Sequence, residues 1–389
     1  MPPDGIPPVV ASAGDLADLI ERVASGTGPV AIDAERASGY RYSQRAYLVQ
    51  LHRAGVGNAL VDPIACPDLS GLNEVLRGVE WVLHAASQDL PCLAEVGMGP
   101  DRLFDTELAG RLLGFPRVAL GTMIEQLLGV RLEKGHSAAD WSTRPLPESW
   151  LAYAALDVEL LIRLRDEVER QLVSAGKLDW ALQEFEGVRR DALAAPTPRI
   201  EPWRRLSGIH RLRRPRQLAA ARALWEIRDA RAERQDIAPG RLLPDSAIVA
   251  AAAAEPADEN ALRALPVFSG ARQRRLSGIW WSAFRDAAEL TDKQLPPMTA
   301  PSQPGSLPPP SRWADRDPEA AERLGRVRTA LTTIAEKNTL PVQNLLEPAL
   351  SRRLAWEPPG DVLAALREGG ARPWQIELTA AELTTALAG

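Results

Sequence analysis

Two acidic residues at the end of an apolar run are the first candidates for chemistry. Asp33 and Glu35 close the run Val30–Glu35, which predicts a β-strand. Residues two apart on a strand point to the same face. Burying two like charges together is costly unless a cation or contact with water stabilises them. The pair therefore indicates a metal-binding strand end, although the same pattern is typical of an ordinary solvated strand edge.

Two further signals lie downstream. Asp89 follows the strand-like run 81–86 near the start of a helix, where the helix dipole alone would favour an acidic residue, and His84 precedes it. Tyr153 and Asp157 are four residues apart, a spacing that places them on one face of a helix. Each signal has an ordinary structural explanation, but their order and spacing together predict one site built from four carboxylates and a phenol.

Other kinds of metal ligand are scarce in the chain. It has four histidines and two cysteines, Cys66 and Cys92, and neither cysteine is spaced with another Cys or a His as in a zinc site. The same spacing argues against a disulfide scaffold. Carboxylate oxygens favour a hard cation, so we expect Mg²⁺ or Mn²⁺.

The first 198 residues alternate short apolar runs with helical patterns, which is typical of an α/β domain. Three predicted strands follow one another too closely for crossover helices, so we expect an antiparallel meander. Two prolines within 194–198 end the domain, because proline cannot continue a helix. The expected strands are 30–35, 46–51, 58–62 and 81–86, and the expected helices are 105–113, 120–128 and about 147–175.

Strand-like alternation disappears after residue 198, and the rest of the chain is predicted to be all-α. A helical domain is expected at 199–290 and another at 319–389. The segment 291–318 between them is rich in proline and is predicted to be an extended linker. The helices expected in the middle domain are 217–234, 245–254, 259–264 and 270–289.

The net charge of −5 conceals a strongly basic segment. Between Arg199 and Arg241, twelve arginines accompany five acidic residues, a local net charge of +7. Such a segment, with Trp203 available for stacking, is typical of proteins that follow a phosphate backbone, although a solvated helix face has the same composition. The chain has no run of about 20 apolar residues that could span a membrane, and its start lacks the basic region of a signal peptide. We therefore expect a cytoplasmic protein without a membrane partner.

Taken together, the acidic motifs resemble those of the DEDD exonuclease superfamily, in the ribonuclease D branch that carries tyrosine in its third motif. The resemblance covers residues from about 28 to 175. The sister branch has a histidine five residues before the last aspartate, where this chain has Ala152. The matching motifs are Asp33 with Glu35, His84 to Asp89, and Tyr153 with Asp157, and similar connecting segments lie at 42–51, 104–106 and 132–147.

The resemblance implies a fold, an activity and a role for each residue. The fold would be a ribonuclease H-like mixed sheet flanked by helices. The activity would be 3′–5′ exoribonuclease hydrolysis of RNA with a free 3′ end, releasing 5′-mononucleotides, in the maturation of tRNA or other structured RNA. Two metal ions about 3.5–4 Å apart would be used, with Asp33 bridging both, Glu35 and Asp157 serving the nucleophile side, and Asp89 the other. Tyr153 would orient the attacking water, since a phenol of pKa near 10 is a poor base.

One departure from the family concerns the handling of terminal bases. The family often has D-T-E-F in its first motif, whereas this chain has Ala34 and Arg36. The aromatic residue that often wedges terminal bases is therefore missing, and we expect Tyr40 or Tyr42 to take its place.

The second half of the chain carries a looser resemblance. The stretch from Trp203 to Leu290 resembles the helicase-and-RNase-D C-terminal (HRDC) domain, a small helical bundle that binds nucleic acid or protein, and 319–389 is predicted to be a second, degenerate copy. The predicted nucleic-acid contacts are Tyr40, Tyr42, Lys134, Arg204, Arg205, Arg211, Arg213 and Arg214.

Two other functions fit the same motifs. A 3′–5′ DNA exonuclease would use the same carboxylates, and the 2′-hydroxyl contacts that distinguish RNA from DNA cannot be placed from sequence. A catalytically silent nucleic-acid-binding scaffold would be expected to lack some of the five motif residues, and all five are present. Because all five precede residue 198, the sequence also predicts that the first domain alone degrades short oligonucleotides.

Overall fold

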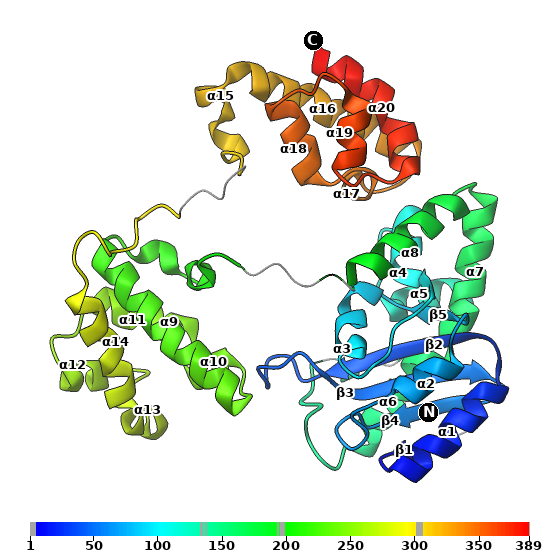
Figure 1. The fold of residues 1–389 in the computed structure, drawn as a ribbon, viewed down its shortest axis with the longest axis horizontal. Coiled ribbons are helices and arrows are strands. Elements are labelled where there is room, and N and C mark those ends of the chain that lie inside the picture. The colour runs from blue at the N-terminus through cyan, green and yellow to red at the C-terminus, as the bar shows by residue number, and fades with distance from the viewer. Residues whose placement is uncertain are drawn as a thin grey trace.

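Six strands form one mixed sheet in the N-terminal domain, in the order β1-β4-β3-β2-β5-β6 (Figure 1). The structure is a computed structural model, and it describes residues 5–132, 135–136, 138–192, 194, 199–300 and 306–388. Strands β2, β3 and β4 form the expected antiparallel meander, whereas β5 pairs in parallel with both β2 and β6. The strands are β1 (Val9–Val10), β2 (Thr27–Arg36), β3 (Ala46–Ala54), β4 (Gly57–Val61), β5 (Glu80–Leu83) and β6 (Arg102–Asp105).

Helices cover this sheet and bury both of its faces. Successive residues of a strand point to opposite faces, and in β4 Leu60 packs in one apolar core with residues of α6 while Ala59 and Val61 pack in another. The sheet with its flanking helices confirms the predicted α/β fold. The helices are α1 (Ala13–Ser25), α2 (Ser70–Val75), η1 (Ala86–Gln88), α3 (Leu90–Ala94), α4 (Thr106–Leu112), α5 (Leu120–Leu128), α6 (Glu148–Glu159), α7 (Leu161–Ser174) and α8 (Leu178–Ala192).

The observed elements of the N-terminal domain differ from the expected ones in several places, which include the unexpected helices α1 and α8. Strands β1 and β6 were not expected, because runs of two and four residues carry too little alternation to register as strands. Asp105, expected to begin a helix, instead ends β6 and caps α4. The single helix expected over 147–175 is interrupted at Leu160, whose ψ of −2° separates α6 from α7.

The middle domain is all-α and has its own apolar core, which includes the buried residues Trp203, Leu224, Ile248 and Trp280. The helix expected over 270–289 is divided at Leu276, whose backbone leaves the helical region. The elements of the domain are η2 (Pro202–Arg205), η3 (Ile209–Arg211), α9 (Pro215–Gln235), α10 (Pro239–Leu242), α11 (Asp245–Ala254), α12 (Glu259–Ala264), α13 (Ala271–Arg275) and α14 (Ser277–Glu289).

The C-terminal domain is also helical, and it begins earlier than the sequence predicts. Trp313 lies within the segment expected to be linker, yet it is fully buried and donates its indole N–H to the carbonyl of Pro308. Among the described residues, no helix is both long and apolar enough to cross a bilayer. The elements are η4 (Pro310–Arg312), α15 (Trp313–Arg316), α16 (Pro318–Lys337), α17 (Val342–Leu345), α18 (Pro348–Trp356), α19 (Val362–Glu368) and α20 (Pro373–Ala388).

The C-terminal domain packs on α8 of the N-terminal domain, and the two share one apolar core. The rings of Trp180 and Trp374 stack with centroids 4.9 Å apart, and the indole N–H of Trp374 donates to Glu184 at 2.9 Å. The buried ammonium of Lys177 donates to the carbonyls of Leu112 in one domain and Asn338 in the other, at 2.7 and 2.5 Å. The first and last parts of the chain therefore fold as one packed unit.

Candidate active site

Asp33 and Glu35 lie on the central strand β2, and both line the same cavity. In the antiparallel register Asp33 is opposite Gln50 of β3, whose amide donates to the Asp33 carboxylate at 2.6 Å. Gln50 has no exposed surface, so this donor holds Asp33 in a fixed orientation. Sequence analysis did not identify Gln50, although a polar residue inside the apolar run 46–51 was an available signal.

Asp89 follows a turn that is stabilised by hydrogen bonds to Asp105, an aspartate that was not among the predicted site residues. Ala85 has a left-handed backbone with φ of 62°, and Asp105 accepts the N–H groups of Ala85 and Ala86 at 3.1 and 2.9 Å. The same carboxylate accepts two N–H groups in the first turn of α4. Asp105 thereby fixes the turn that leads to Asp89. The sequence indicates that Asp105 caps a helix, because an aspartate directly before a helix is a capping signal. Its contact with the turn at Ala85 and Ala86 joins residues that are distant in sequence, so no local pattern predicts it.

His84 belongs to the same motif and lines the cavity. Its Nδ1 lies 2.9 Å from the hydroxyl of Thr106, and burial lowers the pKa of the imidazole to about 4. The ring is therefore neutral near pH 7 and acts as a hydrogen-bonded residue at the end of β5.

Tyr153 and Asp157 lie one turn apart on α6, and both line the cavity that Asp33 and Glu35 line. Trp141 is fully buried, and its ring centroid lies 6.5 Å from that of Tyr153. On another side the chain at Gly135 passes so close that a Cβ there would overlap the Tyr153 ring. The phenol is therefore confined between a packed indole and a glycine backbone.

The structure brings all four predicted carboxylates together. Oxygen atoms of Asp33, Glu35 and Asp157 lie within 4.8 Å of one another, and the carboxyl group of Asp89 hydrogen-bonds with that of Asp33. All four open into a cavity of about 1030 Å³. The guanidinium of Arg36 lies in the wall of this cavity, 4.0 Å from Asp89.

Burial raises the pKa values of all four carboxylates, and neighbouring carboxylate charges add to this for Glu35, Asp89 and Asp157. Burial, followed by the charges of Asp33 and Asp157, raises the pKa of Glu35 to about 10. Burial, followed by the charge of Asp33, raises the pKa of Asp157 to about 8. Burial also raises the pKa of Asp33 and of Asp89. A site that disfavours four negative charges alone favours them with a cation, and donors that are all oxygen fit Mg²⁺ or Mn²⁺.

The Tyr153 phenol is a hydrogen-bond donor and not a general base. Burial, followed by the charges of Asp157 and Glu35, raises the pKa of Tyr153 well above its ordinary value. The hydroxyl therefore keeps its proton near neutral pH. It can donate a hydrogen bond, but it cannot remove a proton from water.

Comparison with known proteins identifies the domains. Residues 8–173 match the model of a 3′–5′ exonuclease domain, residues 217–283 that of the HRDC domain, and residues 306–387 that of a 3′ to 5′ exonuclease C-terminal domain. A ribonuclease D from Granulibacter bethesdensis is 32% identical over 288 residues, which cover 72% of this chain and 72% of the relative. The chain belongs to the ribonuclease D family. Its exonuclease domain and its ribonuclease D relatives confirm the prediction of a hydrolytic 3′–5′ exoribonuclease.

Two solved structures resemble this chain over all or nearly all of its length. A protein from Bifidobacterium adolescentis is 38% identical, with a TM-score of 0.91 over 100% of this chain and 98% of that chain. The ribonuclease D of Escherichia coli, described as an exoribonuclease involved in structured RNA processing, is 25% identical, with a TM-score of 0.68 over 98% of each chain. That the last domain is a degenerate HRDC copy stays a prediction, since its matching model is a different one.

The two tyrosines expected to handle terminal bases lie in the loop 37–45 between β2 and β3. Among the described residues that line the catalytic cavity, neither is present. The guanidinium of Arg241 lies 3.8 Å from the centroid of the Tyr40 ring, and the Tyr42 hydroxyl donates to Asp229 at 3.2 Å. In this arrangement both rings serve the contact with the middle domain. Lys134 lies outside the described residues.

The five arginines predicted to contact RNA are not all free to do so. Arg204 donates to Glu201 at 2.6 Å, and its guanidinium lies 4.4 Å from the centroid of the Trp203 ring. Arg214 forms an ion pair with Glu255 at 2.5 Å. Their use as RNA contacts stays a prediction. The exposed members of the set without such a partner among the described residues are Arg205, Arg211 and Arg213.

Proposed function

We propose that this 3′–5′ exoribonuclease works with two divalent ions, Mg²⁺ or Mn²⁺, and trims the 3′ ends of tRNA or other structured RNA. The proposal is carried by the convergence of four buried or half-buried carboxylates on one cavity. Asp33, Glu35 and Asp157 would hold one ion, and Asp89 would hold the second together with Asp33. When bound, such ions acidify the attacking water and stabilise charge on the attacking and leaving oxygens of the phosphodiester.

The side chains around the carboxylates prepare the site for this hydrolysis. Gln50 fixes the orientation of Asp33, and Asp105 fixes the turn before Asp89. The protonated phenol of Tyr153 donates a hydrogen bond that can orient the attacking water. Arg36 offers a positive charge to the phosphate in the same cavity.

The products follow from the direction of attack. Water adds to the phosphorus of the terminal phosphodiester, and the bond from that phosphorus to the 3′-oxygen of the penultimate nucleotide breaks. The last nucleotide leaves as a 5′-mononucleotide, and the shortened RNA keeps a free 3′-hydroxyl for the next cycle. Support for a structured RNA substrate comes from the description of the Escherichia coli relative.

Digestion of matched 5′-labelled RNA and DNA oligomers with Mg²⁺ or Mn²⁺ tests the proposal. RNA should shorten progressively from its 3′ end, and EDTA or Asp33→Asn should reduce the rate by at least about a hundredfold, since metal-site chemistry carries several kcal/mol of the barrier. Asp166→Asn, which changes an exposed carboxylate on α7, is the matched control and should keep full activity.

Three outcomes would contradict the proposal in different ways. Undiminished activity after EDTA would exclude the metal mechanism, and cleavage of a circular RNA would exclude an end-dependent reaction. Faster digestion of DNA than of RNA would favour a DNA exonuclease, and no digestion of either would leave a silent scaffold. Asp33→Asn should not lower the thermal midpoint, because it removes one of several crowded negative charges, and this separates loss of catalysis from loss of fold.

A further inference from the structure

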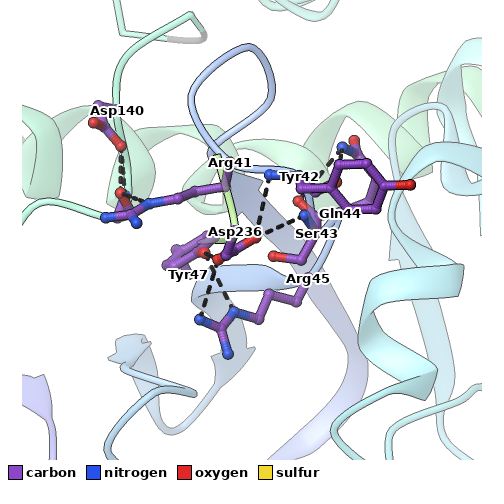
Figure 2. A network of polar contacts seen from close by, with 9 residues as sticks. Arg41, Tyr42, Ser43, Gln44, Arg45, Tyr47, Asp140 and Asp236 are labelled. Atoms are coloured by element: carbon purple, nitrogen blue, oxygen red, sulfur yellow. Dashed lines mark hydrogen bonds and ion pairs between the residues drawn. The ribbon is translucent and has the colours of Figure 1, made fainter. Parts of the chain in front are cut away.

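The middle domain meets the catalytic domain at the end of α9, where Asp236 closes the helix in a left-handed conformation with φ of 46°. Its carboxylate accepts the backbone N–H groups of Tyr42 and Ser43 at 3.1 and 2.9 Å (Figure 2). It also accepts the hydroxyl of Tyr47 at 3.2 Å. One side chain of the middle domain thus binds the loop 37–45 of the catalytic domain at two points and the strand β3 at a third.

The next helix of the middle domain, α10, continues this contact. The backbone N–H of Ala238 donates to the carbonyl of Tyr40 at 2.9 Å, and Arg241 donates to the carbonyl of Gly39 at 2.7 Å. The other end of the same loop reaches the active site, because Ser38 lines the catalytic cavity. A short stretch of backbone therefore connects α10 to the cavity wall.

A group of arginines surrounds this corner of the middle domain. Arg272 of α13 donates to the carbonyl of Arg241 at 3.2 Å, which places α13 beside α10. Arg272, Arg274, Arg275 and Arg241 are all exposed. Within the described part of the chain, no acidic side chain lies within ion-pair distance of any of the four. The charges of Arg272, Arg274 and Arg275 are thus available to a ligand, whereas the Arg241 guanidinium already contacts the Gly39 carbonyl and the Tyr40 ring.

The arginines singled out from the sequence occupy a different place. Arg214 caps the first turn of α9, and Arg213 precedes it. The 21 residues of α9 span about 30 Å at 1.5 Å per residue, so these two lie about that far from Asp236 and the catalytic loop. The corner formed by α10 and α13 therefore lies nearer to the loop 37–45 than these two arginines do.

We propose that Arg272, Arg274 and Arg275, here called the α13 arginine surface, bind the phosphate backbone of the RNA behind its 3′ end, beside the contact that Arg241 makes with the loop 37–45. This inference rests on the proposed exoribonuclease function and names the surface that holds its substrate. Guanidinium groups suit this use because their planar donors match phosphate oxygens, and each contact releases condensed counterions. Asp236 fixes the surface beside the cavity by holding the loop 37–45.

The mutual placement of the domains is supported by a solved structure. The Bifidobacterium adolescentis protein matches 100% of this chain with a TM-score of 0.91. A value this high over all domains requires that they be arranged in the same way in both proteins.

Two triple variants that remove equal charge discriminate between the two sets of arginines. The first is R272Q/R274Q/R275Q, and the second is R205Q/R211Q/R213Q. Binding to an RNA hairpin with a single-stranded 3′ tail is measured at several salt concentrations, in Ca²⁺ to suppress cleavage. Circular dichroism and the thermal midpoint of each variant establish that the middle domain is folded.

The first variant should bind at least about tenfold more weakly, and its log–log salt slope should be shallower by about 2, since each lost contact on a single strand contributes about 0.7. The second should bind within about twofold of the unmodified protein. Equal affinities for the two variants, or a loss confined to the second, would overturn the assignment. An unmodified protein that cleaves no RNA would instead overturn the proposed function, so the two failures are distinguishable.

Discussion

The C-terminal domain and the middle domain contact the catalytic domain through different chemistry. The C-terminal domain shares an apolar core with it, centred on the stacked rings of Trp180 and Trp374. The middle domain has a separate core, against which only Tyr42 of the loop 37–45 packs, and it touches this loop mainly through hydrogen bonds to Asp236 and through Arg241. Removing the C-terminal domain would expose apolar surface to water, which is costly. Removing the middle domain would free mainly polar groups, which can form hydrogen bonds with water instead.

This difference changes which parts of the chain form the catalytic unit. The sequence predicts that residues 1–198 suffice for catalysis on short substrates, because every motif residue precedes residue 198. In the structure, that fragment would lose the helices that bury Trp180 and would leave Lys177 without its carbonyl partner from Asn338. The self-sufficient unit is therefore expected to be the first and last domains together, and the middle domain is expected to be separable.

The largest single-residue effects should come from two buried tryptophans, one in each helical domain. Trp374→Ala should destabilise the catalytic unit by about 3–5 kcal/mol, as usual for a buried Trp, and lower the temperature at which cleavage of short oligomers is lost. Trp280→Ala removes an equally buried ring but should unfold the middle domain alone. Thermal unfolding followed together with oligomer cleavage measures both. Equal loss of cleavage in the two variants would contradict the comparison.

A smaller effect is expected for Asp236→Ala, which leaves the N–H groups of Tyr42 and Ser43 without their acceptor. Losing such a partner costs about 1–3 kcal/mol. Here the loss should weaken the contact between the middle domain and the loop 37–45. Hydrogen exchange of the loop 37–45 should accelerate while the thermal midpoint of the catalytic unit stays constant. Glu226→Gln, an exposed change on the same helix, should alter neither, and unchanged exchange in Asp236→Ala would argue that the contact is weak.

The smallest expected effect is that the stability of the two domain contacts depends on pH with opposite signs. Burial raises the pKa of Glu184 despite its hydrogen bond from Trp374, so the native state binds a proton more readily than the unfolded state. Stability from this group therefore grows as pH falls toward 5. For Asp236, burial acts to raise the pKa, but the hydrogen bonds from Ser43 and Tyr47 outweigh it and lower the pKa. Its contribution is complete above about pH 4 and is lost below that.

Thermal midpoints of Glu184→Gln and of the unmodified protein, measured from pH 7 to pH 5, check the first sign. As the pH falls, the thermal midpoint of the unmodified protein should rise relative to that of the variant. Hydrogen exchange of the loop 37–45 in Asp236→Asn, compared with the unmodified protein, checks the second, and their difference should shrink below pH 4. Shifts in the same direction at both contacts would contradict the assignment of one apolar and one polar contact.

The convergence of the candidate catalytic residues was predictable because each motif describes a local geometry. Asp33 and Glu35 share a strand face, and Tyr153 and Asp157 share a helix face, whatever the rest of the fold does. Gln50 was missed because its role depends on the pairing register of two strands, which the sequence of one strand does not contain. The amphipathic pattern that predicts a helix also does not tell which domain covers its apolar face.

The location of the RNA surface could not be predicted for a related reason. The segment 199–241 has the highest density of arginine that sequence analysis identified, but several of these residues are paired, and others lie at the far end of α9. The short helix α13 carries three arginines in five residues, and its contacts with the carbonyls of Arg241 and Leu242 bring them beside the loop 37–45. Charge density can be counted along a chain, whereas distance from the active site requires the fold.

Two matched deletions test most directly the claim that the first and last domains form the nuclease and the middle domain holds the RNA. In one, residues 199–300 are replaced by a flexible Gly/Ser linker, and in the other the chain ends at residue 300. The first protein should fold, cleave short single-stranded RNA with a kcat within about threefold of the full chain, and bind the tailed hairpin at least about tenfold more weakly, because several phosphate contacts are lost. The second should unfold at a lower temperature and lose cleavage of the same oligomers. A folded first protein without oligomer cleavage, or a second protein with unchanged stability and activity, would contradict the account.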